Sequence, residues 1–124
     1  MTDSKVLGAD LYGLTIVAKR NFPTVAREYG TAKQAVLATV DLQAAAFDRP
    51  HHFGGGHGVA MQAWEQLRDE VATLLGETET SLDLSAEALM MCVNAFASAD
   101  AGAAAELNRL NRVNGVPTPL GSVA

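Results

Sequence analysis

The chain has 124 residues and a mass of 13.0 kDa, which is the size of a single domain. Hydrophobic residues make up 48% of the sequence and charged residues 19%, so the chain can bury a core and is not disordered by composition. The net charge of −5 is unevenly placed: residues 1–50 carry six Lys/Arg and five Asp/Glu, whereas residues 51–124 carry three and nine. The acidic second half argues against nucleic acid as a partner.

Cys92 is the only cysteine, so an internal disulfide is excluded. The N-terminal residues lack a basic segment followed by an apolar one, and no conventional signal peptide is expected. Uninterrupted apolar runs stay short of the ~18 residues that cross a bilayer, which predicts no membrane-spanning segment. These features predict a cytoplasmic protein, or one exported by a route that reads a different signal.

A first helix is predicted over about residues 5–47, because apolar residues recur there at steps of three and four. Pro23 falls inside this pattern and cannot donate a backbone hydrogen bond to the preceding turn. The apolar phase continues past it, which favours a kink in one helix over a short helix that ends near Asn21.

The segment from 48 to 58 contains a proline and several glycines and predicts a sharp turn, with Gly56 and Gly58 as its turn motif. A second helix is expected over about residues 59–100, with a short helical extension at 101–112. Residues 1–112 then form one helical hairpin domain, and 113–124 form a mobile tail.

The second helix carries one continuous seam at alternating steps of three and four residues, which keeps a stripe facing a neighbouring helix over five heptads. The residues expected to pack the hairpin or a partner are Trp64, Leu67, Val71, Leu74, Leu82, Leu89 and Phe96. The fold class is therefore all-α, as an elongated antiparallel two-helix hairpin. More apolar surface remains than one seam can bury, which predicts dimerisation into a four-helix bundle.

No pattern in the sequence predicts catalysis. His51, His52 and His57 flank the glycines, but no thiol or ordered fourth ligand accompanies them, so solvated loop histidines are favoured over a metal site. The sequence therefore predicts no catalytic residue, no metal and no cofactor, and a protein that is not an enzyme. One enzymatic hypothesis ranks last: a small enzyme that uses the histidine-rich loop.

Two short matches resemble the Trp-x-Gly (WxG) family of small actinobacterial helical hairpins, which includes the EspC-like proteins exported by type VII (Esx) secretion systems. In that family a Trp-x-Gly turn is followed by small residues and then by an aromatic residue. Here Gly58-Val59-Ala60 leads to Trp64, and Gly56 stands where the family has tryptophan.

The second match is Phe96-Ala97-Ser98-Ala99-Asp100, which is similar to the family's Tyr-x-x-x-Asp/Glu export signal near the end of the second helix. Phe96 stands in place of tyrosine. The resemblance implies that Phe96 and Asp100 form the export signal and that a type VII export ATPase recognises it. It also implies secretion without a conventional signal peptide, and a homodimer or a heterodimer with a paralogous helical hairpin.

Together these features predict a non-enzymatic type VII secretion substrate or secretion-associated protein that acts by dimerising with itself or a paralogue. The alternative is a cytosolic adaptor or chaperone that binds the helical targeting region of a secreted effector or toxin.

Overall fold

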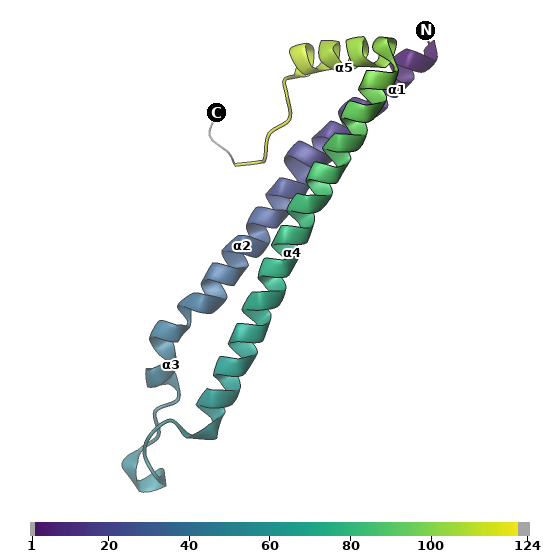
Figure 1. The fold of residues 1–124 in the computed structure, drawn as a ribbon. Helices are drawn as coiled ribbons and strands as arrows, with labels where there is room; N and C mark the ends of the chain where they lie inside the picture. The colour runs from purple at the N-terminus through teal and green to yellow at the C-terminus, as the bar shows by residue number, and fades with distance from the viewer. Residues whose placement is uncertain (1, 122–124) are drawn as a thin grey trace. The chain divides into compact units, whose positions relative to one another are not determined.

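The computed structural model describes residues 2–121, which form helices and short connections and contain no strand. The all-α prediction is therefore confirmed. In chain order the elements are α1 (Thr2–Ile16), the π-helical turn η1 (Val17–Asn21), α2 (Phe22–Ala38), α3 (Val40–Ala46), the 3-10 turn η2 (His51–Phe53), α4 (Gly58–Ala99) and α5 (Ala101–Asn114) (Figure 1).

The chain divides into two units. Unit 1 comprises Met1–Ala26 and Thr80–Ala124, and unit 2 comprises Arg27–Glu79. Helices α2 and α4 each contribute residues to both units, and each unit is described by itself below.

The predicted kink at Pro23 takes the form of a π turn. The backbone N–H of Phe22 donates to the carbonyl of Val17, five residues back, so the turn before Pro23 is wider than an α-helical turn. A wider turn makes room for the proline ring, which would otherwise press against the preceding carbonyl. The hydroxyl of Thr24 also donates to the carbonyl of Arg20 within this turn.

The first helix also breaks where the sequence predicts none, at Thr39 between α2 and α3. The hydroxyl of Thr39 donates to the carbonyl of Val36 at 2.7 Å, and its backbone N–H donates to the same carbonyl at 3.2 Å. A threonine side chain that bonds the preceding turn competes with regular helical hydrogen bonding. This local competition explains why α2 ends at Ala38.

Unit 1 has a small core in which three helices meet. Leu11 of α1, Val93 of α4, and Ala103 and Leu107 of α5 form a buried cluster. The partly buried residues packed against this cluster are Leu7, Tyr12, Met90 and Ala97. α5, predicted as a short extension over 101–112, thus runs to Asn114 and packs on α1 (Figure 1).

The contact between α1 and α5 depends on a glycine. A Cβ atom placed on Gly8 would lie 2.5 Å from the Cβ of Glu106 and 2.9 Å from the carbonyl oxygen of Ala103. Real Cβ contacts are not this short, so only glycine permits the two backbones to approach so closely. Ala103, opposite, is fully buried.

The segment after α5, predicted as a mobile tail from residue 113, makes definite contacts with unit 1. The Tyr12 hydroxyl donates to the carbonyl of Gly115 at 2.9 Å, and Arg20 Nε donates to that of Thr118 at 3.2 Å. The N–H of Leu120 donates to the Thr24 hydroxyl at 2.9 Å. Pro117, which lies between Gly115 and Thr118 in the sequence, is buried. Residues 122–124 lie outside the described part of the chain.

In unit 2, polar side chains join the helices on either side of the loop. Gln43 of α3 donates to Glu65 Oε1 of α4 at 2.8 Å and accepts a hydrogen bond from Arg68 Nη1. Gln43 interrupts the apolar spacing of the first helix in the sequence, and this network explains how it is accommodated there. Lys33 of α2 lies over Gly76 of α4.

The loop between α3 and α4 requires its glycines. Gly54, Gly55, Gly56 and Gly58 all have positive φ angles, with Gly56 at +65° and Gly58 at +71°. Residues with a Cβ rarely adopt this conformation, so the predicted turn motif at Gly56 and Gly58 has a conformational basis. Arg49 holds the loop closed: its N–H donates to Gly56 O at 2.9 Å and its Nε to Gly55 O at 3.2 Å.

We expect Gly8→Ala to destabilise the packing of α5 on α1, because the added methyl group collides with backbone and with Glu106. The matched control is Gly13→Ala in the same helix, where a Cβ meets nothing within 4 Å. Since alanine favours a helix over glycine by roughly 0.5–1 kcal/mol, Gly13→Ala should raise the thermal unfolding midpoint, whereas Gly8→Ala should lower it by several degrees. Equal midpoints for the two variants would contradict this account of the α1–α5 contact.

Candidate protein-interaction surface

The side chains of the predicted seam on α4 are divided between the packed face and the surface. Trp64, Val71, Leu82 and Leu89 are partly buried. In contrast, Leu67 is 53% exposed, Leu74 62% and Phe96 53%. These last three residues are exposed within the described chain, so of the two predicted roles, packing the hairpin or packing a partner, contact with a partner stays a prediction.

The most buried residues of α4 follow a different line, which the sequence analysis missed. Ala72 in unit 2, and Ala86 and Val93 in unit 1, are buried on the face that packs within the chain. They too recur at multiples of seven residues, so the period alone could have identified them. The predicted seam residues have large side chains, whereas the buried line consists of two alanines and a valine. Small side chains allow a neighbouring helix to approach closely.

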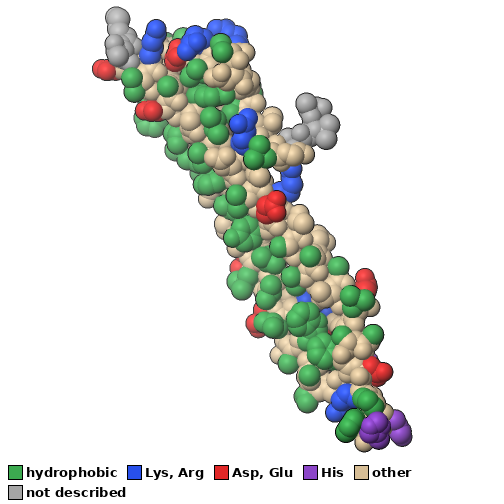
Figure 2. Space-filling view, turned by 180° about the vertical axis from the view of Figure 1, so that it is seen from behind, with side chains coloured by type: hydrophobic (Ala, Val, Ile, Leu, Met, Phe, Trp, Pro, Cys, Tyr) green, Lys and Arg blue, Asp and Glu red, His purple; other side chains and the backbone are tan. Residues whose placement is uncertain are grey.

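The exposed part of the predicted seam leaves an apolar surface in each unit. In unit 2 it consists of Leu67 and Leu74, which we call the unit 2 flank, and in unit 1 it includes Phe96. Figure 2 shows hydrophobic side chains recurring along the exposed surface, with charged side chains scattered among them. Burying exposed apolar area stabilises a complex by roughly 25 cal/mol per Å², so this surface is suited to a partner.

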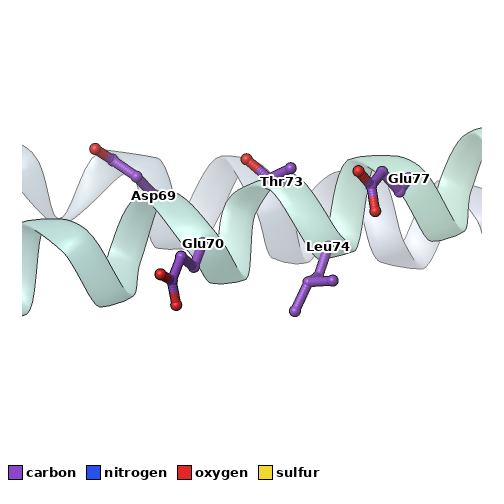
Figure 3. A pocket seen from close by; sticks show the side chains of 5 residues that line it. All are labelled: Asp69, Glu70, Thr73, Leu74 and Glu77. Atoms are coloured by element: carbon purple, nitrogen blue, oxygen red, sulfur yellow. The ribbon is translucent and has the colours of Figure 1, made fainter.

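Carboxylates border the unit 2 flank. Asp69, Glu70 and Glu77 line a shallow depression with Thr73 and Leu74, and all five residues belong to α4. Figure 3 shows Glu70 and Leu74 projecting to the same side of the helix, one turn apart. Because one helix supplies the whole lining, this is an open surface and not an enclosed ligand cavity.

Asp100, the second residue of the predicted export signal, connects α4 to α5. Its carboxylate accepts a hydrogen bond from the N–H of Ala103 at 3.0 Å and so caps the first turn of α5. The Ser4 hydroxyl of α1 lies 3.2 Å from both carboxylate oxygens. Phe96 lies one turn earlier, and its carbonyl accepts the N–H of Asp100 at 3.1 Å. The two predicted signal residues thus lie one turn apart, and the Asp100 side chain forms hydrogen bonds with residues of α1 and α5.

These hydrogen bonds lower the pKa of Asp100. The largest cause is the N–H of Ala103, which lowers the pKa. Desolvation, the second largest, raises it, and the Ser4 hydroxyl and the N–H of Gly102 lower it further. On α5, the side chain of Arg109 lowers the pKa of Glu106, with its two nitrogens 2.7 and 2.9 Å from the Glu106 oxygens.

The histidine-rich loop lies in unit 2. His51 and His52 are exposed, and His52 stacks on Phe53 with ring centroids 4.3 Å apart. Figure 2 shows the histidine side chains, in purple, gathered at the loop. Among residues 2–121, no group of three or more His, Cys, Asp or Glu side chains is arranged to hold a metal ion.

One property of α4 bears on the prediction that no segment spans a membrane. The helix contains an 18-residue window that is apolar enough, and poor enough in charge, to cross a bilayer by length and composition. The prediction rested on uninterrupted apolar runs, and none in α4 approaches this length. This criterion uses length and composition alone.

No family model, curated protein or solved structure matches this chain. The function proposed below therefore rests on the residues and geometry described above.

We expect Asp100→Ala to destabilise unit 1 in a pH-dependent way. The folded-state pKa lies below the ordinary value of 3.8, so the stabilisation is present above about pH 4 and is lost as the pH falls through the folded pKa. The thermal midpoint of the variant should lie a few degrees below that of the wild type at pH 7, and the two should converge in acid.

Ser4→Ala is the matched control, because it removes one hydrogen bond to the carboxylate and leaves the one from Ala103. Its effect at pH 7 should be smaller than that of Asp100→Ala. A difference between wild type and Asp100→Ala that is the same at pH 3 and pH 7 would show that the carboxylate charge contributes nothing.

Proposed function

We propose that this chain is a non-enzymatic helical hairpin that works by pairing with a second helical protein, as a substrate or accessory of a type VII (Esx) secretion system. In each unit α4 lies beside helices from the first half of the chain, which supports a hairpin. The resemblance at Gly58–Trp64 and Phe96–Asp100 supports the secretion system.

The observation that carries the pairing is the exposure of large apolar side chains on α4. Leu67, Leu74 and Phe96 each leave about half or more of their surface in water. Burying the exposed part of each leucine would contribute roughly 1 kcal/mol to a complex. Several such residues on one helix suit a partner helix better than a small ligand, because the depression beside Leu74 is lined by one helix alone.

The export signal is the second part of the proposal. The exposed Phe96 ring is accessible to a receptor such as the export ATPase, and Asp100 lies one turn away at the end of α4. Under this proposal a receptor reads the aromatic ring and the carboxylate as a pair.

A cytosolic adaptor that holds the helical targeting region of an effector or toxin is the second candidate. One observation favours it: the Asp100 carboxylate already caps α5 and binds Ser4, so it has a role within the fold without any receptor. An adaptor would use the same apolar surface of α4 and would stay in the cell.

We expect the double variant Leu67→Ser/Leu74→Ser to weaken association with itself or its natural partner by about 30-fold, because roughly 2 kcal/mol of apolar burial is lost. Light scattering after size exclusion, on the chain purified alone and co-expressed with its genomic neighbours, would measure this. Met91→Ser is the control, since Met91 is also exposed on α4, at 72%, but belongs to unit 1. Pairing is refuted if the wild type is monomeric in every preparation.

Two variants of Asp100 distinguish a role in the export signal from a role as the cap of α5. Asparagine also caps helices, so Asp100→Asn should keep the fold, less stable than the wild type at pH 7 but more stable than Asp100→Ala, while losing the charge. We expect both Asp100→Asn and Asp100→Ala to be absent from the culture supernatant of a secreting host and present in the lysate. Wild-type amounts of Asp100→Asn outside the cell would mean that Asp100 is only a cap. Retention of the wild type in the lysate, with its partner bound, would select the adaptor.

A further inference from the structure

We infer that the unit 2 flank receives an amphipathic helix whose apolar stripe is edged with lysine or arginine, and not a second copy of this chain. This inference rests on the proposed function, because it specifies the chemistry of the partner at the same surface. It decides between a homodimer and a heterodimer at this site.

The first step is the shape of the surface. Leu67 and Leu74 lie seven residues apart, two turns along one helix, and both are exposed. This spacing is the one at which a partner helix inserts its own heptad residues. The part of α4 in unit 2, residues 58–79, is about 33 Å long at ~1.5 Å per residue, which accommodates a partner of about three heptads.

The second step is the sign of the charge along the edge of the unit 2 flank. Unit 2 contains four Lys/Arg and eight Asp/Glu. Two of the cations already have partners: the Arg49 side chain binds the carbonyl of Gly55, and Arg68 binds Gln43 and Asp69. Of the three bordering carboxylates, only Asp69 therefore pairs with one of these two arginines. Glu70 and Glu77 are exposed on α4, one turn before and one turn after Leu74 (Figure 3). An incoming helix therefore meets negative charge along this edge.

The third step compares the two kinds of occupant. If α4 paired antiparallel with its own copy, the Glu70 and Glu77 edge would face the same edge of the partner, and like charges would repel. If it paired parallel, heptad geometry would place Glu70 opposite Leu75 of the copy, which offers no cation. A helix with lysine or arginine at the positions beside its apolar stripe neutralises these carboxylates in either direction.

The test uses two synthetic peptides of three heptads, each with leucine at the a and d positions. One carries lysine at the e and g positions and the other glutamate. We expect the lysine peptide to bind the full-length chain about tenfold more tightly at low salt, as two or three surface ion pairs allow. The preference should disappear near 1 M salt, where charges are screened within about 3 Å.

Charge reversal locates the effect. Glu70→Lys/Glu77→Lys should reverse the preference toward the glutamate peptide, whereas Glu87→Lys, an exposed residue of α4 in unit 1, should leave it unchanged. Equal affinities for the two peptides, failure of both to bind, or the same shift with Glu87→Lys would each overturn the inference.

The failure of this inference is distinguishable from failure of the proposed function. Self-association that is lost in Leu67→Ser/Leu74→Ser, without any preference for the lysine peptide, would keep the pairing and reject the basic partner. A chain that stays monomeric and that neither co-expressed neighbours nor either peptide binds would reject both.

Discussion

The close approach of α1 and α5 is the constraint on which unit 1 depends. Gly8 allows the two backbones to meet, and Ala103 fills the contact without a larger side chain. Asp100 fixes the direction of α5 by capping its first turn and by binding Ser4 of α1. Because α5 is held in place, Leu107 can join Leu11 and Val93 in a core, although the unit is small. Tight backbone contact replaces the bulky core that a sequence with few aromatic residues cannot build.

The same preference for small residues accounts for the surface of α4. Where α4 packs within the chain, its buried positions include Ala72 and Ala86. Its larger residues, among them Leu67 and Leu74, are displaced to the side of the helix and remain exposed. The exposure of these large apolar side chains underlies the proposed function.

Charge then limits which partner is suitable. The glutamates beside Leu74 contribute little to the stability of unit 2, since exposed carboxylates interact weakly through water. They matter when another helix approaches and water is displaced between the two. Under the inference drawn above, the apolar residues would supply affinity and the bordering charges selectivity, so one surface of α4 would reject its own copy and still bind a basic helix.

The sequence by itself determined the all-α class, the glycine-rich connection before Gly58, and the long second helix, because periodicity and glycine conformation are local properties. It also drew attention to Phe96 and Asp100 through a short pattern. Only the tertiary structure decided which side of α4 is buried, because two stripes with the same period differ in how closely a neighbouring helix can approach them. It likewise brought the Ser4 hydroxyl of α1 to the Asp100 carboxylate, from a residue 96 positions earlier in the chain. Contacts between residues so far apart in the chain leave no local pattern in the sequence.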